Sequence, residues 1–486
     1  MRVSCLHSEN AFLLRGGIFC YDGVALHFSA YRSIFVPMNA KILMTHYRET
    51  VRIGVPIVVG QLGVIILGFA DTMMVGHYNT PSLAAASFVN NIFTLVTIML
   101  MGFSYGITPL VGALFSRKEH AKAGALMRPA FVANACFGLL LVGIMTVIYF
   151  FLDCFNQPES LMPLIRPYYI VILCSMLPVV VFNVCRQFTD GIMLTPVAMW
   201  ILLGGNVFNI VFNYLLIYGK AGFPEMGLLG AGISTMSSRV LMAVVAVWLL
   251  FRKQRFAAYR EGFAKARVTA GDVWYHVRMS FPISLQMGME TGTFTFSAVM
   301  VGWIGELQMA SYQVMVTMST LGYLFYYGIG SAVAIRIASF TGLGDMQGVR
   351  RAAFAGHSIL LLLAVCASSA FFFLSDTLVF LFTDDAAVVG ICLTLIAPLI
   401  LYQFCDATQV CYANALRGTS HVMPMMWIAF VSYVLVGIPV AYLLGFPAGF
   451  GEKGIFYSFS ISLFTAAVLF LWQFLKVAWK SQSQKE

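Results

Sequence analysis

The sequence predicts an all-α integral membrane protein with twelve transmembrane helices, arranged as two six-helix lobes that are related by a parallel repeat. Its composition supports this fold class first. Of the 486 residues, 60% are apolar and only 10% are charged, whereas a soluble globular protein has about 25% charged residues. Apolar runs such as 388–405 approach the ~20 residues that cross a bilayer as a helix. This composition excludes a soluble enzyme, a secreted disulfide scaffold and a disordered protein.

Twelve apolar segments, bounded by charged or Gly/Pro-rich turns, are the expected spans. We expect the first six to begin near Val51, Ala86, Ala125, Pro163, Pro196 and Leu228, and the second six near Arg278, Met309, Ala352, Ala386, Val422 and Lys453.

The connections between these spans differ sharply in their content of Lys and Arg. One alternating set carries 21 of these residues, and the other carries only Arg166, Lys220 and Lys453. Positive residues concentrate on the cytoplasmic side of a membrane protein, so the split predicts an even number of spans and two cytoplasmic termini in the cell (inner) membrane. The net charge of +9 is explained by this bias, and we expect no nucleic-acid partner.

An internal repeat divides the chain into two halves. At a constant offset of 226, positions 51–102 show 11 identities without a gap, and Pro56 pairs with Pro282. We expect both prolines to kink the first helix of their lobe. With six spans in each half, both lobes enter the membrane in the same sense. The two lobes are then related by rotation about an axis along the membrane normal. The expected units are residues 41–251, a cytoplasmic linker at 252–277, and residues 278–486.

Residues 1–40 form an N-terminal extension that fits no span. Arg15 and Asp22 interrupt its apolar stretch, and Met38 directly precedes the first basic segment. We expect the natural start at Met38, with residues 1–37 dispensable or wrongly assigned.

Three acidic residues are expected inside spans, where a charged side chain is costly and marks a functional site by default. These are Asp71 in span 1, Glu290 in span 7 and Asp406 in span 10. Glu290 and Asp406 are expected near the middle of the membrane. Asp71 has two interpretations, because the nearby Gly76 and His77 would also fit a position at the outer end of its helix.

Amide side chains accompany these acids at helical spacing. Gln286 lies four residues before Glu290, Gln403 and Gln409 flank Asp406 at three-residue spacing, and Asn206, Asn209 and Asn213 form a stripe in span 5. Carboxylates with amide oxygens suit a hard cation such as Na⁺, whereas carboxylates alone suit proton exchange. The alternative is that the amides only hydrogen-bond one helix to another. Met287 beside Glu290 suits either an adaptable substrate cavity or ordinary packing.

No enzyme is predicted. The sequence places no nucleophile–base arrangement and no metal-binding cluster in a span. Its ten cysteines lie mostly in apolar segments without metal-ligand spacing. We therefore expect no cofactor and no bound metal beyond a transported Na⁺.

Several motifs together resemble the multidrug and toxic compound extrusion (MATE) family, and within it the NorM-type branch. The resemblance covers residues 41–480. It rests on the segments 68–76 (GFADTMMVG), 230–235 (GAGIST) and 403–418, and on the pair Asn209 and Asn213 that leads into 214–217.

This resemblance implies a two-lobed exporter that works by alternating access. It implies that amphipathic, mostly cationic drugs or toxins leave the cell in exchange for Na⁺ or H⁺, carried by a monomer in contact with lipid. The implied second-lobe cation site contains Glu290 and Asp406, and the implied first-lobe site contains Asp71, Asn209, Asn213 and Thr235. Some relatives have aspartate where this chain has Asn213, which leaves the choice between sodium and proton open.

The alternative is a flippase for lipid-linked precursors, from the same wider superfamily. Such a protein would be expected to have a basic cavity for phosphate groups. Only Arg239 and Arg336 are expected to be both buried and basic, so the sequence favours the exporter.

Overall fold

The computed structural model describes residues 40–155, 157–383 and 385–480, and within these ranges the chain is helical with no β-strand. The N-terminal extension and the hypothesis about Met38 lie outside the described residues. The long helices are α2 (Ala40–Tyr78), α3 (Thr80–Ser104), α4 (Ile107–Ser116), α5 (His120–Phe150), α6 (Met162–Cys174), α7 (Met176–Gly191), α8 (Thr195–Ile217), α9 (Gly227–Arg252), α11 (Ala270–Ile304), α12 (Glu306–Leu343), α13 (Met346–Phe373), α15 (Ala386–Gly418) and α18 (Gly451–Lys480). Shorter elements are η1 (Leu152–Phe155), η2 (Glu159–Leu161), η3 (Gln254–Phe256), α10 (Ala257–Lys265), α14 (Ser375–Phe380), α16 (Met423–Ala429), η4 (Phe430–Gly437) and α17 (Ile438–Gly445).

The predicted spans are confirmed as helices. Eleven helical segments of the described chain are long and apolar enough to cross a membrane. The twelfth span is α11, which has 35 residues but carries more polar side chains. Several helices begin earlier than expected, most of all α2, which starts at Ala40 instead of Val51. The stretch before Val51 has no glycine or proline to stop the helix, so it continues into the basic segment.

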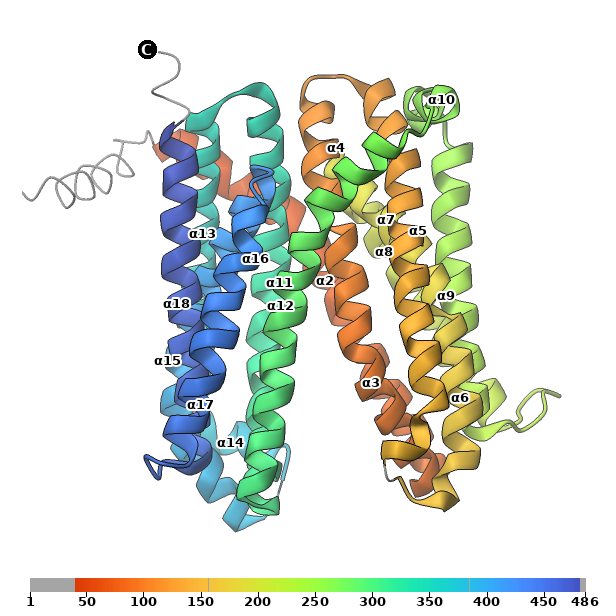
Figure 1. The fold of residues 1–486 in the computed structure, drawn as a ribbon, viewed down its shortest axis with the longest axis vertical. Coiled ribbons are helices and arrows are strands. Elements are labelled where there is room, and N and C mark those ends of the chain that lie inside the picture. Colours follow the sequence, from red (N-terminus) through yellow and green to blue (C-terminus); the bar gives the residue numbers. More distant parts are fainter. Residues whose placement is uncertain (1–39, 156, 384, 481–486) are drawn as a thin grey trace, which may run out of the picture.

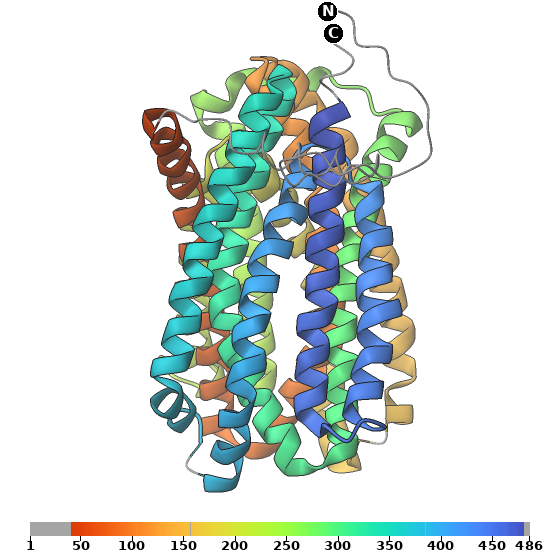
Figure 2. The same ribbon diagram turned by 90° about the vertical axis from the view of Figure 1, so that its left-hand side faces the viewer.

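Two helical bundles stand side by side in Figure 1, one coloured orange to yellow-green and the other green to blue. The first lobe comprises α2–α9 and the second comprises α11–α18. In the first lobe α8 packs on α2 and α9, and in the second α15 packs on α12, α13 and α18. Figure 2 shows the second lobe from its outer side, with its helices roughly parallel to the long axis. This arrangement confirms the two-lobed fold class.

The linker between the lobes contains a short helix that docks on the first lobe. Helix α10 packs on α5, and glycines make the contact possible. A Cβ atom on Gly124 would collide with the carbonyl oxygen of Tyr259, and a Cβ atom on Gly262 would collide with that of Ala121. Burial in this contact raises the pKa of Tyr259. Figure 1 places α10 and the last turns of α18 at one end of the molecule, here called the α10 end.

The lobes meet mainly through three helix pairs, α2 with α12, α4 with α12, and α3 with α11, and α2 also contacts α13 while α5 contacts α11. The α4–α12 contact lies at the α10 end and is very close. A Cβ atom on Gly342 would lie 2.5 Å from both the Cα atom and the carbonyl oxygen of Ala113. Arg117 donates a hydrogen bond of 2.6 Å from Nε to the carbonyl oxygen of Gly342. The lobes are therefore packed together at this end.

A buried arginine makes a second connection between the lobes at the α10 end. Arg336 of α12 is only 5% exposed. It donates to the carbonyl oxygen of His46 (2.8 Å) and to Oγ1 of Thr50 (2.7 Å), both on α2, and it lies 2.7 Å from Nδ1 of His46. The expected burial of Arg336 is confirmed, and its donors are used to join α12 to α2.

Candidate functional site

The first-lobe residues predicted to bind a cation lie together where α2, α8 and α9 meet. Asn213 donates from Nδ2 to Oδ1 of Asp71 (2.5 Å) and to Oδ1 of Asn209 (2.9 Å). Asn209 in turn donates to Oγ1 of Thr235 (3.3 Å). Asn209 and Asn213 are buried, and Asp71 is partly buried. These four residues form one hydrogen-bonded chain.

A basic side chain, Arg239 of α9, also acts on this chain. It interacts electrostatically with Asp71 and donates to Oγ of Ser175 (2.6 Å). Arg239 is only partly buried, although the sequence predicted burial. Asn206, the third member of the asparagine stripe, stays apart, because its buried Nδ2 has no hydrogen-bond partner among the described residues.

The second-lobe residues predicted for the cation site also converge, from α11 and α15. Gln286 donates to Oε2 of Glu290 (2.8 Å), as their spacing on one helix face allows. Glu290 and Asp406 interact electrostatically, and Asp406 is only 1% exposed. Gln409 donates to the hydroxyl of Tyr433 (2.9 Å), and both side chains interact with Glu290.

Tyr433 is a member of this cluster that the sequence analysis missed. It lies in η4, a π-helical segment between α16 and α17. Its hydroxyl is the only polar atom of its side chain, and the segment around it reads as an ordinary apolar span. No spacing rule would have selected it. Gln403 lies farther out in the stripe, where it accepts a hydrogen bond from Tyr326 (2.8 Å).

Several buried oxygen atoms of these clusters lack a hydrogen-bond donor among the described residues. In the second lobe they are Oε1 of Gln286, Oδ2 of Asp406 and Oε1 of Gln409, and in the first lobe Oδ1 of Asn213. A buried acceptor without a donor is costly. A carboxylate with amide oxygens is also the ligand set that a hard cation prefers, and a proton on a carboxyl would equally supply a donor. The arrangement therefore suits either coupling ion.

A cavity of about 530 Å³ lies between the lobes, and its lining comes from α2, α3, α11, α12, α15 and α18. This volume is in the range of sites for drug-sized ligands. Glu290 is the one charged side chain among the described residues that line it, and Met287 lines it as well. Gln286, Gln403, Asp406 and Gln409 lie outside the lining. Seven aromatic side chains also line it, alongside aliphatic and hydroxyl side chains, and they are Tyr105, Phe294, Tyr323, Tyr327, Tyr402, Phe456 and Phe459.

The two predicted kink residues lie inside continuous helices. Pro56 is within α2 and Pro282 is within α11. Proline removes one hydrogen bond from each helix, so both are weak points at the same position of the repeat. Kinking itself stays a prediction.

The structure corrects the sequence analysis at three charged residues. Asp190 is not among the three acids expected inside spans, and Arg186 and Arg417 are among the 21 basic residues expected in the cytoplasmic connections. All three lie inside helices and are 5%, 6% and 8% exposed, respectively. The buried arginines among the described residues are thus Arg186, Arg336 and Arg417, of which the sequence predicted only Arg336. The four-residue spacing of Arg186 and Asp190 was an available signal, because it places opposite charges on one helix face.

Comparisons with known proteins agree with this geometry. The family model MatE matches the chain twice, at residues 56–215 and 282–443. The two matches start at Pro56 and Pro282, which is the offset of the internal repeat.

Similar proteins cover nearly the whole chain. A probable multidrug resistance protein NorM from Xylella fastidiosa (strain 9a5c) is 28% identical over 435 residues, covering 89% of this chain and 92% of the relative. The crystal structure of the eukaryotic MATE transporter AtDTX14 has a TM-score of 0.81 at 18% identity, covering 91% and 99% of the two chains. A multidrug resistance MATE family transporter of the MOP superfamily in an outward-facing conformation has a TM-score of 0.80 at 17% identity, covering 90% and 97%.

Proposed function

Because the chain belongs to the MatE family of membrane transporters, we propose that it exports amphipathic, mostly cationic drugs or toxins in exchange for Na⁺ or H⁺. Transport needs no cofactor in this proposal. The protein works as a monomer in the cell (inner) membrane, with both termini in the cytoplasm. Its moving units are the lobes 41–251 and 278–486, joined by the linker 252–277.

One observation carries this proposal: Glu290 belongs both to the cavity wall and to the buried cluster with Asp406. A cationic substrate in the cavity can pair with Glu290 and stack on the surrounding aromatic rings. A Na⁺ or H⁺ bound by the cluster removes the negative charge that holds this substrate. Substrate and coupling ion therefore compete for one carboxylate.

Such competition supplies the energy difference that alternating access requires. A ligand moves a two-state protein only if it binds the two states with different affinity. In the proposed cycle the ion neutralises Glu290 and Asp406, the lobes rock about the axis between them, and the substrate leaves on the outer side. The first-lobe chain of Asp71, Asn209, Asn213 and Thr235 is a second place where the same ion can act.

The runner-up function is a flippase for lipid-linked precursors. Its substrate carries phosphate, which calls for basic side chains in the cavity. Neither lysine nor arginine lines the cavity among the described residues, whereas Glu290 does. The charge of the cavity thus favours the exporter.

The test is transport of ethidium into inverted membrane vesicles, with either a sodium gradient or a proton gradient imposed alone. Export of a cation in exchange for an ion predicts dye accumulation under at least one gradient. Sodium alone would identify Na⁺ as the coupling ion, and a proton gradient alone would identify H⁺. No accumulation under either gradient would contradict export of this dye class and favour the flippase.

Two substitutions test the site. Glu290→Gln and Asp406→Asn keep the shape of each side chain but remove its charge, so we expect each to abolish coupled transport without preventing expression. Glu306→Gln and Asp376→Asn are matched controls at exposed acids, and both should transport normally. Transport retained in both Glu290→Gln and Asp406→Asn would refute the second-lobe site.

A further inference from the structure

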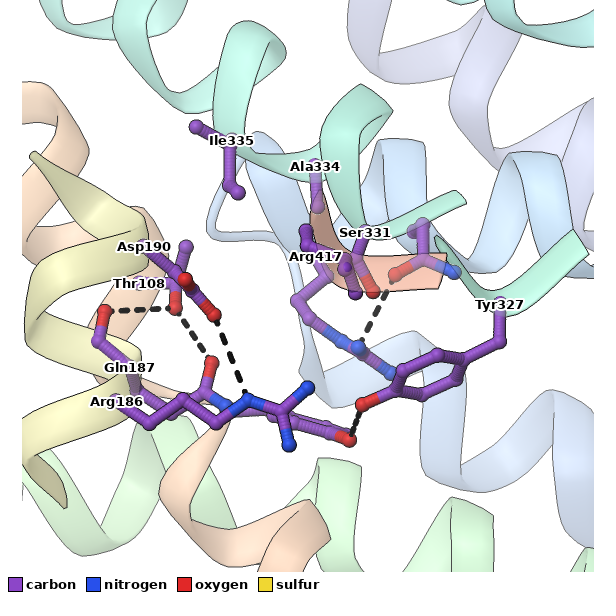
Figure 3. Close-up of a pocket in the computed structure, with 12 residues that line it drawn as sticks. Thr108, Arg186, Gln187, Asp190, Tyr327, Ser331, Ala334, Ile335 and Arg417 are labelled. Atoms are coloured by element: carbon purple, nitrogen blue, oxygen red, sulfur yellow. Dashed lines mark hydrogen bonds and ion pairs between the residues drawn. The ribbon is translucent and has the colours of Figure 1, made fainter. Parts of the chain in front are cut away.

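Five polar side chains close the space between the lobes on the α10 side of the cavity. We call this cluster the polar seal. Figure 3 shows Arg186 and Asp190 on the side of the first lobe, facing Arg417 and Tyr327 of the second. The members are Tyr105, Arg186 and Asp190 of the first lobe and Tyr327 and Arg417 of the second.

The seal joins the lobes directly. The hydroxyl groups of Tyr105 and Tyr327 hydrogen-bond to one another, although the two residues are 222 positions apart in the chain. The guanidinium of Arg417 lies over the ring of Tyr105, 4.7 Å from its centroid, and donates to Oδ1 of Asn414 (3.1 Å). A first-lobe ring is thereby held between two second-lobe side chains.

The same tyrosines form a wall between two spaces. Tyr105 and Tyr327 line the cavity of about 530 Å³, and they also line a small space of about 20 Å³ on the side of the seal that faces Arg186 and Asp190. A space of about 10–15 Å³ holds roughly one water molecule. A drug-sized molecule in the cavity therefore cannot leave through the seal while the lobes stay together.

The charges of the seal do not balance. Arg186 and Arg417 contribute two positive charges and Asp190 one negative charge, which gives a net charge of +1. Nε of Arg186 lies 3.9 Å from Oδ2 of Asp190. Removing one partner from a buried pair leaves an uncompensated charge, which is strongly unfavourable. Asp190 is the one acid among the described residues that line this space, and it is the acid that pairs with Arg186. Arg417 also interacts electrostatically with Glu290 of the neighbouring cavity.

We propose that Asp190 determines how firmly the cavity is closed on the α10 side, by neutralising Arg186 and Arg417 when the lobes meet there. In the opposite conformation these side chains would face water, where their charges are solvated. The net charge of the seal therefore changes the free energy of the closed state. It thereby sets the equilibrium between the conformation that is open at the α10 end and the one that is open at the opposite end. This inference rests on the proposed alternating access, but not on the identity of substrate or ion.

The inference predicts an ordered set of variants. Asp190→Asn raises the net charge from +1 to +2, so we expect the ratio of seal-open to seal-closed molecules to rise by about tenfold or more. The double variant Arg186→Gln/Asp190→Asn returns the net charge to +1 and should restore most of the closed state. Arg186→Gln alone lowers it to 0 and should leave the seal closed. Asp376→Asn, at an exposed acid, is the control.

Distances between spin labels measure this ratio without any transport. In the full chain, with its ten cysteines replaced by alanine or serine, one label pair at Lys122 and Gln347 reports on the α10 end. A second pair at Ser160 and Glu306 reports on the opposite end, and all four positions are exposed or at the surface of their helices. Protein in lipid vesicles should show a longer Lys122–Gln347 distance in Asp190→Asn and a shorter Ser160–Glu306 distance.

Two results would overturn the inference. One is a distance distribution in Asp190→Asn that matches the unchanged protein. The other is a double variant that stays as open as Asp190→Asn, because a role in packing alone would not be rescued by charge. If Asp190→Asn does not fold, Arg186→Gln alone still tests the inference, because a longer Lys122–Gln347 distance in that variant would contradict it. Failure of ethidium transport in the unchanged protein would affect the proposed function and leave these distances interpretable.

Discussion

Replacing Gly342 by alanine should open the α10 end of the molecule. Gly342 lies on α12 of the second lobe, and its missing side chain lets the backbone of Ala113 on α4 approach closely. An added Cβ atom would lie 2.5 Å from Cα and from the carbonyl oxygen of Ala113. Both are backbone atoms of a helix, so they cannot turn aside as the end of a flexible side chain could. The two lobes must separate locally to accept the methyl group.

The size of the effect follows from the cost of overpacking. Forcing an extra methyl group into a well-packed contact costs about 1–3 kcal/mol. Alanine also favours the helix over glycine by up to about 1 kcal/mol, but this gain is equal in both conformations and cancels. Only the contact between lobes differs, so the ratio of open to closed molecules should rise by about 5-fold to 150-fold.

The Lys122–Gln347 and Ser160–Glu306 spin-label pairs measure this change in lipid vesicles. Gly204→Ala is the matched control, because a Cβ atom there meets no other atom within 4 Å. We expect Gly342→Ala to populate the longer Lys122–Gln347 distance and Gly204→Ala to leave it unchanged. Equal distributions in the two variants would refute the idea that the α4–α12 contact holds this end closed.

Two further predictions concern local stability. Asn213→Ala removes the amide that donates to both Asp71 and Asn209, and a lost hydrogen bond to a charged group costs about 1.5–3 kcal/mol. The detergent-solubilised variant should therefore melt at a lower temperature, whereas Asn91→Ala, at an exposed position, should melt as the unsubstituted protein does. Equal melting temperatures of the two variants would contradict the hydrogen-bonded chain. Gly124→Ala places a methyl group against the carbonyl oxygen of Tyr259 and should release α10 from α5. Limited proteolysis should then cut residues 252–269 faster than in the control Gly143→Ala, where a Cβ atom meets nothing within 4 Å. Identical cleavage rates in the two variants would argue against the docking of α10 on α5.

The fold and both acidic clusters were predictable because each depends on local rules. Apolar segments of sufficient length become spans, and Gln286 with Glu290, or Asn209 with Asn213, share a face at four-residue spacing. Rarity of acids inside spans then selected Asp71 and Asp406. None of these arguments needs knowledge of how the lobes pack.

The polar seal was not predictable, because it depends on how the two lobes pack against one another. Tyr105 and Tyr327 meet only because two lobes lie against one another, and aromatic residues are common throughout the chain. Arg186 and Arg417 read as the basic ends of spans, since burial between lobes and exposure to the cytoplasm give the same sequence pattern. Tyr433 was missed because a π-helical turn changes which side chains face Glu290, and period-based reasoning assumes a regular α-helix.

The π-helical segment η4 requires a fixed number of residues in its span more than it requires particular apolar residues. A π turn holds an additional residue compared with an α turn, so η4 accommodates one residue that a regular helix would not. Deleting a residue there would let the segment close as a regular α-helix. The helix beyond it would keep its direction, but side chains within η4, Tyr433 among them, would turn out of register with Glu290. Apolar substitutions leave that register intact. Between Met423 and Gly445, insertions and deletions should therefore be tolerated far less than exchanges of one apolar residue for another.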